Sequence, residues 1–84
     1  MAEKIEFVVN GKTLSLSRAQ VLDSVAGLEA EPIRSHSVVI GGTHYPVKQV
    51  FERATGLDRL DFTSAVARRQ LLRLGFKPQR QRQT

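Results

Sequence analysis

The sequence predicts a small α+β protein made of two degenerate tandem β-hairpin–helix units, followed by a C-terminal helix and a basic tail. Strand patterns flank two turn dipeptides, Asn-Gly at 10–11 and Gly-Gly at 41–42, the first alternating polar and apolar and the second a β-branched run, and a helical pattern follows each hairpin. The segments QVLDSVAGL at 20–28 and QVFERATGL at 49–57 also align, with Gln, Val, Gly and Leu identical. These observations favour a ββα unit that occurs twice.

The chain of 84 residues, 40% hydrophobic and 25% charged, has the size and composition of one folded domain. We expect a single compact domain over residues 1–76 and a disordered basic tail over 77–84. The absence of cysteine excludes disulfides, thiolate zinc sites and a cysteine nucleophile. No apolar run approaches the roughly 18 residues of a membrane span, and no signal-peptide pattern opens the chain, so the expected location is cytoplasmic.

The first unit, residues 4–28, is predicted to begin with a hairpin. A two-residue Asn-Gly turn suits type I′ geometry, and it places Phe7 opposite Leu14 and Ile5 opposite Leu16. One face of this hairpin is then apolar across both strands.

A helix is predicted after this hairpin. Ser17 is a favoured N-cap residue, and the apolar positions Ala19, Leu22 and Val25 indicate a helix that ends before Gly27. We expect Leu22 and Val25 to pack against the hairpin.

The second unit, residues 36–57, repeats the pattern. A β-branched strand over 37–40 pairs back through 43–45, and Pro46 suits the first turn of a helix better than the middle of a strand. Gly56 is the expected helix stop. The apolar residues expected to face the hairpins from this helix are Val50, Phe51 and Ala54.

The second unit is followed by an added helix, residues 63–75, which has no counterpart after the first unit. Phe62 is a predicted core anchor, Thr63 or Ser64 can cap the helix, and Gly75 ends it. The residues expected to face inward are Ala67, Leu71 and Leu74.

Basic charge is concentrated at the C-terminal end. The net charge is +5, and the last 17 residues hold six basic side chains and no acidic one. Such an asymmetry is the electrostatic footprint of a surface that binds phosphates. The alternatives are a solvated arginine face on a packing helix and a solubilising tail. The six side chains are Arg68, Arg69, Arg73, Lys77, Arg80 and Arg82.

The leading prediction is therefore a DNA-binding protein that contacts DNA through the added helix, the tail and the polar edge of the second hairpin. Hydroxyls and amides at helix N-termini suit phosphates, and Arg, Gln and His can reach base edges. Lys48, Arg68 and Arg69 are the first choices, whereas Tyr45 can instead be a core aromatic. The predicted DNA-binding residues are Arg34, Ser35, His36, His44, Tyr45, Lys48, Gln49, Thr63, Ser64, Arg68, Arg69, Arg73, Lys77 and Arg80.

The sequence does not favour an enzyme. His44 faces Val39 across the predicted turn rather than His36, so the two histidines do not form a metal site. The carboxylates are scattered, and the Gly-Gly pair is explained by the hairpin turn. We expect no cofactor, no metal and no small-molecule substrate.

The segment HSVVIGGTHYPVKQVFERATGLDRLDFTSAVARRQLLRLGF, within residues 35–76, resembles a family of small actinobacterial DNA-binding proteins, some of which recognise 5-methylcytosine in duplex DNA. The resemblance implies binding to double-stranded DNA with little dependence on flanking sequence, a preference for the modified base and association with the nucleoid. The motifs that carry it are Tyr45-Pro46-x-Lys48, Phe62-Thr63-Ser64 and Leu74-Gly75-Phe76.

Two other classes remain open from the sequence. One is a protein-interaction, adaptor or antitoxin-like module without base recognition, in which the nearly neutral first unit is a docking or homodimer surface. The other is RNA binding, which the scarcity of exposed aromatic residues makes less attractive.

Overall fold

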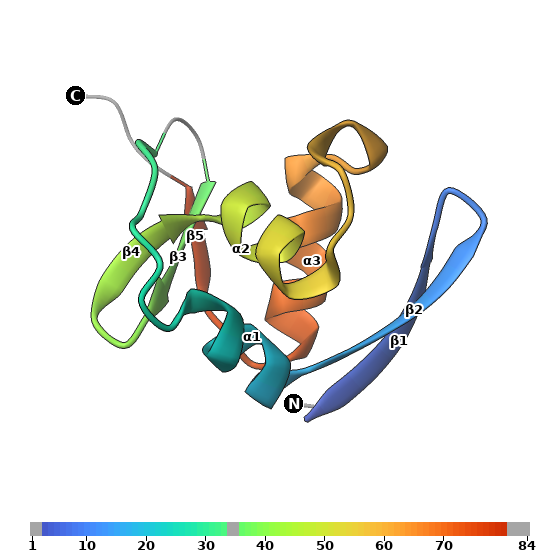
Figure 1. Cartoon of the computed structure of the whole chain (residues 1–84), viewed down its shortest axis with the longest axis horizontal. Coiled ribbons are helices and arrows are strands. Elements are labelled where there is room, and N and C mark those ends of the chain that lie inside the picture. The colour runs from blue at the N-terminus through green and yellow to red at the C-terminus, as the bar shows by residue number, and fades with distance from the viewer. Residues whose placement is uncertain (1–2, 34–35, 81–84) are drawn as a thin grey trace.

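The computed structural model describes residues 3–33 and 36–80 (Figure 1). Two antiparallel sheets and three α-helices confirm the predicted α+β class within these residues. The elements in chain order are β1 (Lys4–Val9), β2 (Lys12–Ser17), α1 (Arg18–Val25), β3 (His36–Ile40), β4 (Thr43–Pro46), α2 (Val47–Thr55), the 3-10 helix η1 (Arg59–Asp61), α3 (Ser64–Arg73) and β5 (Pro78–Arg80).

The two hairpins belong to separate sheets. Strands β1 and β2 form one sheet, and the other has the order β4-β3-β5. In Figure 1 the three helices lie between them, with the first hairpin extending along one side. The element order therefore contains two ββα successions, but the hairpins do not pair with each other.

The first hairpin has the predicted register. Phe7 pairs with Leu14 and Ile5 with Leu16 across a turn in which Asn10 has φ 50° and Gly11 φ 78°. Both residues of a type I′ turn need positive φ, which Asn and Gly adopt most readily. The Asn10 side-chain amide also donates to the backbone carbonyl of Asp61 at 3.2 Å, which ties the hairpin tip to η1.

Helix α1 begins as predicted but buries a different face. Ser17 Oγ accepts from the Gln20 N–H while the Gln20 side chain accepts from the Ser17 N–H, so the two form a capping box. Val21 and Val25 are the buried residues, and the predicted inward Leu22 is 45% exposed. A helix that packs mainly on α2 buries one i, i+4 row, and Leu22 lies one residue beyond that row.

The second unit also follows the predicted register. His44 lies opposite Val39, as expected, and Gly56 ends α2 in the left-handed conformation with φ 77°. Pro46 differs slightly from its predicted place in the first turn, because it ends β4 and is the N-cap residue of α2.

The prediction of a disordered tail is wrong for Pro78–Arg80. These residues form β5, which pairs antiparallel with the edge of β3 that β4 leaves open. Phe76 is only 5% exposed, and its N–H donates to the Leu71 carbonyl at 3.1 Å. Anchoring of Phe76 holds the following residues beside β3, so backbone pairing can order a segment that lacks apolar side chains. Residues 81–84 of the predicted tail lie outside the described part.

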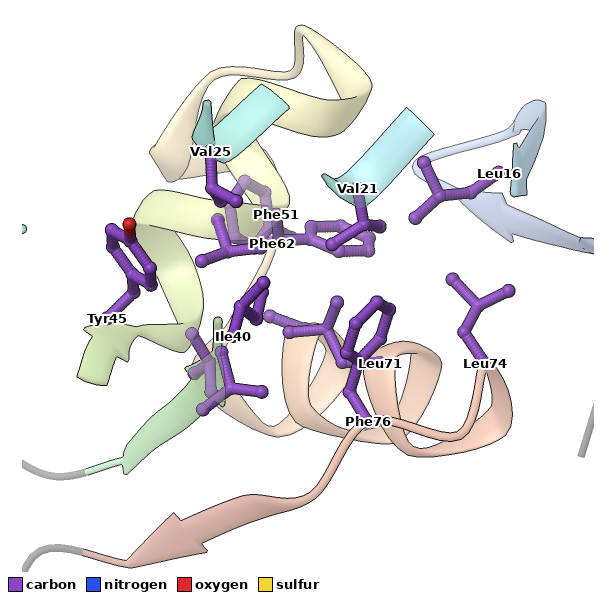
Figure 2. Packing of buried hydrophobic residues seen from close by; sticks show 14 of the residues in the cluster. Leu16, Val21, Val25, Ile40, Tyr45, Phe51, Phe62, Leu71, Leu74 and Phe76 are labelled. Carbon is purple, nitrogen blue, oxygen red and sulfur yellow. The ribbon is translucent and has the colours of Figure 1, made fainter. Parts of the chain in front are cut away.

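The core centres on Phe51, which is fully buried (Figure 2). Its ring centroid lies 5.6 Å from that of Phe7 and 4.8 Å from that of Phe62, the second pair in an edge-to-face arrangement. The predicted inward residues of α3, Ala67, Leu71 and Leu74, are all at most 1% exposed. One hydrophobic cluster thus joins the first hairpin, the helices and the second sheet.

We expect Phe51→Ala to lower the free energy of unfolding by about 3–5 kcal/mol, because it removes a ring from the centre of this cluster and leaves a cavity. Urea denaturation measures the loss. Leu60→Ala is the control, because Leu60 is 93% exposed and its truncation should change stability by no more than about 0.5 kcal/mol. Similar losses for the two variants would contradict a core centred on Phe51.

Candidate nucleic-acid interface

The outer face of α3 is strongly basic. Arg68, Arg69 and Arg73 are exposed, whereas Ala67 and Leu71 of the same helix are fully buried, and the helix contains no acidic residue. Since the inward row anchors the helix, the arginines on the opposite side are held toward solvent.

The three arginines are not equivalent. One guanidinium nitrogen of Arg73 donates to the Gln70 side-chain oxygen at 2.7 Å and to the Glu6 carbonyl at 3.3 Å, which ties Arg73 to β1. Within residues 3–33 and 36–80, Arg68 and Arg69 have no hydrogen bond or ion pair. They are the α3 arginines whose donors stay available to a ligand.

A pocket of about 170 Å³ lies where α2 and α3 begin. It brings together three predicted site residues from three elements: His36 from β3, Lys48 from α2 and Ser64 from α3. The residues that line it are Glu31, Pro32, His36, Pro46, Val47, Lys48, Arg59 and Ser64.

Lys48 and His36 give the pocket its polar character. The Lys48 side chain is half-buried, and its Nζ lies 5.8 Å from the centroid of the Phe62 ring, within cation–π range. The Nδ1 atom of His36 is buried and has no hydrogen-bond partner among the described residues. A buried imidazole nitrogen without a partner is an uncommon arrangement in a folded protein.

Arg59 joins the pocket wall to two carboxylates. Its guanidinium binds Glu31 in a bidentate pair, both contacts at 2.7 Å, and Glu52 at 2.9 Å. The hydrogen bond from Arg59 lowers the pKa of Glu31, and the Glu31 hydrogen bond, followed by that of Glu52, raises the pKa of Arg59. Arg59 is paired with two carboxylates, whereas Lys48, the other lysine or arginine of the lining, makes no ion pair among the described residues.

Strand β5 adds Arg80 to the same region. Arg80 pairs with His36 in the β3–β5 register, and directly opposed residues of an antiparallel pair project on the same face of the sheet. Arg68 lies one helical turn after Ser64 and shares its side of α3. Arg68, Ser64, the pocket and Arg80 therefore form a path from the helix to the edge of the second sheet.

Three predicted contacts lie elsewhere. His44 projects from the opposite face of the β3–β4 pair to Tyr45, because neighbouring residues of a strand alternate in direction. Tyr45 is 6% exposed and belongs to the core, as its alternative interpretation held. The Gln49 side chain is buried, with only 4% of its surface exposed. Its burial is possible because the side-chain amide donates to the Glu29 carbonyl and accepts from the Glu31 N–H, both at 2.9 Å.

The remaining predicted residues are spread over other parts of the molecule. Thr63 is exposed and caps α3 by accepting from the Val66 N–H at 3.2 Å. Lys77 lines a second depression, beside Arg18 and Phe76. Arg34 and Ser35 lie outside the described residues.

Sequence reasoning missed Arg18, which lies in the nearly neutral first unit. Its guanidinium carbon is 4.4 Å from the Phe76 ring centroid, and it donates to the Leu74 carbonyl at 3.0 Å. Arg18 and Lys77 line a second depression of about 400 Å³ together with Val39, Gly75, Phe76 and Gln79. No signal in the sequence links Arg18 to the C-terminal end, because folding alone brings the two together.

In the described part of the chain, no group of three His, Asp or Glu side chains is arranged to hold a metal ion. Within the same residues, no helix has the length and apolarity needed to cross a membrane.

The chain belongs to the SCO5918-like family, which it matches over residues 6–84. No curated protein and no solved structure gives a significant match to it.

The Glu31–Arg59 pair predicts a pH dependence of stability. The pKa of Glu31 is lowered in the folded protein from an ordinary value of 4.5, so its contribution is complete above that value and is lost as the pH falls through the folded pKa. Because the Glu31 side chain is 43% exposed, solvent screening keeps the contribution below about 1 kcal/mol.

We expect Glu31→Gln to be less stable than the wild type at pH 7 and to approach it as the pH falls to 3. Urea unfolding at several pH values checks this, with Arg59→Gln as the partner variant that removes the same pair. A stability difference that stays constant from pH 7 to 3 would contradict the assigned pair.

Proposed function

We propose that this protein binds duplex DNA through the path that runs from the α3 arginines across the pocket to Arg80. The observation that carries the proposal is the pair Arg68 and Arg69, exposed on a helix without acidic residues and engaged by no other described side chain. Nucleic acids attract such groups because binding releases counterions condensed on the phosphates. A protein with this activity is expected in the cytoplasm, associated with the nucleoid.

The dimensions of α3 suit the DNA major groove. An α-helix with its side chains is about 10–12 Å across, and the major groove, about 12 Å wide, admits a helix such as the ten-residue α3. In this arrangement Arg68 and Arg69 contact phosphates on either side of the helix and set its orientation. Such contacts carry no sequence information themselves, which agrees with sequence-tolerant binding.

We propose a preference for 5-methylcytosine, read by Leu72. Leu72 is 60% exposed and lies one turn after both Arg68 and Arg69, on the face between them. The methyl group at cytosine C5 projects into the major groove as the thymine methyl does, and apolar side chains recognise it by contact. The resemblance to proteins that recognise this base supports the same preference.

The two ββα successions are proposed to be degenerate copies of one unit. In the aligned helical segments the identical valines, Val21 and Val50, are both fully buried, and the identical glycines, Gly27 and Gly56, both have positive φ. The aligned glutamines differ in role, since Gln20 caps α1 and Gln49 holds a loop. Duplication of one unit accounts for the shared burial and glycine conformations, and later divergence accounts for the different roles of the two glutamines.

A protein-interaction module is the second candidate. Val8 on the first hairpin is 66% exposed and Leu22 on α1 is 45% exposed, so the first unit offers apolar side chains to a partner or to a second copy. This candidate would be favoured if the protein binds a protein partner with an affinity that does not depend on salt and does not bind duplex DNA.

We expect Arg68→Ala combined with Arg69→Ala to weaken binding to all duplexes. The wild-type plot of log affinity against log salt concentration should have a negative slope, and loss of two phosphate contacts should make it shallower by about two. Fluorescence anisotropy over a salt series measures both quantities.

The control for this experiment is Lys4→Ala combined with Lys12→Ala, which removes the same charge from the first hairpin. It should leave the slope nearly unchanged. A wild-type affinity without salt dependence, or equal losses in both double variants, would refute the assigned interface.

The methyl preference predicts that a duplex with 5-methylcytosine competes better than an otherwise identical unmethylated duplex. Leu72→Ala should remove this difference while it leaves affinity for the unmethylated duplex nearly unchanged, because the arginines remain. Leu60→Ala, at another exposed leucine, is the matched control. Equal competition by both duplexes for the wild type would rule out the preference.

A further inference from the structure

Helix α2 begins without a side-chain cap. Ser17, Asp58 and Thr63 each accept a hydrogen bond at the start of their helices, but the N-cap residue of α2 is Pro46, whose side chain cannot accept one. Within residues 3–33 and 36–80, no side chain accepts from the first N–H groups of α2. These groups need another acceptor, since the first N–H groups of a helix have no partner within it.

The uncapped end of α2 faces the pocket between α2 and α3, where it meets a second helix start. Val47 and Lys48, the first residues of α2, line the pocket together with Ser64, the first residue of α3. Each helix N-terminus carries a partial positive charge, so two of them in one pocket favour an anion.

The side chains of the pocket favour an anion as well. Lys48 contributes a positive charge that forms no ion pair within residues 3–33 and 36–80, and the Ser64 hydroxyl can donate a hydrogen bond. His36 also lines the pocket, and its buried Nδ1 lacks a hydrogen-bond partner among the described residues.

The size and walls of the pocket restrict the anion to a small one. About 170 Å³ is well below the roughly 300–1,000 Å³ typical of drug-sized ligand sites. Pro32, Pro46 and Val47 form an apolar wall, and such a wall strengthens charge interactions by limiting water. A carboxylate has two oxygens, whereas donors from two helix ends, Lys48 and Ser64 can serve the several oxygens of a tetrahedral group.

We propose that the pocket between α2 and α3 is a binding site for a phosphoryl group. Lys48 Nζ, Ser64 Oγ and the N–H groups that open α2 are its donors, and Glu31 limits its affinity from the rim while paired with Arg59. That the pocket binds this group stands on its own geometry. That a nucleic acid supplies the group rests on the proposed function.

The test is a titration of the full chain with inorganic phosphate, followed by ¹H–¹⁵N NMR. Saturable shifts are expected at the amides of Val47, Lys48, Ser64 and Ala65. Lys48→Met keeps the apolar stem and should weaken binding about tenfold or more, as expected for loss of one charge-assisted hydrogen bond.

Glu31→Gln should instead strengthen binding, because it removes a negative charge from the pocket rim. The control is Lys12→Met, which removes the same charge from the first hairpin and should leave phosphate affinity unchanged. Shifts that do not saturate, or equal losses for Lys12→Met and Lys48→Met, would overturn the proposal.

Two further arms identify the source of the phosphoryl group and separate this site from the proposed function. Arg68→Ala combined with Arg69→Ala should lose duplex affinity but keep the inorganic phosphate shifts. If this variant loses both its duplex affinity and the shifts caused by inorganic phosphate, the claim that the pocket binds phosphate separately from these arginines is wrong. Lys48→Met should weaken the binding of a short duplex. If the variant weakens binding only when the duplex carries a 5′-phosphate, the pocket binds a terminal phosphate rather than a backbone phosphate.

Discussion

The arrangement of this protein depends on the burial of Phe51 between Phe7 and Phe62. The three rings come from α2, from the first hairpin and from the segment before α3, so two aromatic contacts that share Phe51 join parts far apart in the chain. Edge-to-face and tilted ring pairs add to the stabilisation from apolar burial. An 84-residue chain without disulfides has few other means of holding two small sheets together.

The pocket is a consequence of this packing. Phe62 enters the core one residue before the α3 cap, so α3 has to begin near α2, on which the ring packs. Arg59 then fastens the turn between the two helices to Glu31 and Glu52. Two helix N-termini and Lys48 meet at one place because the core directs both helices there, so the partial positive charges of two helix ends lie beside one pocket.

The basic residues divide into those that the fold uses and those that it leaves available. Arg18, Arg59 and Arg73 are each engaged by an aromatic ring, carboxylates or carbonyl groups of the protein. Arg68 and Arg69 have no such partner in the described part of the chain. Net charge alone therefore overstates the binding surface, and the contacts of each guanidinium indicate which residues a ligand can use.

Local pattern was sufficient for much of the fold. Turn dipeptides predicted both hairpin registers, and capping residues predicted where α1 and α3 begin, because these features depend on neighbours within a few residues. Leu22 was assigned to the wrong side of α1, since periodicity does not say which neighbour a helix packs on. Of the predicted site residues, His36, Lys48 and Ser64 line one pocket, while Gln49 and Tyr45 are buried.

The sequence by itself determined the class of the fold, the hairpin registers and the basic C-terminal third, because these follow from local residue order and charge. Tertiary structure decided the rest. It added β5 to β3, placed Arg80 beside His36, and brought Arg18 to Phe76. These outcomes required contacts between residues distant in the chain, where backbone pairing and core packing, rather than local preference, select the partner.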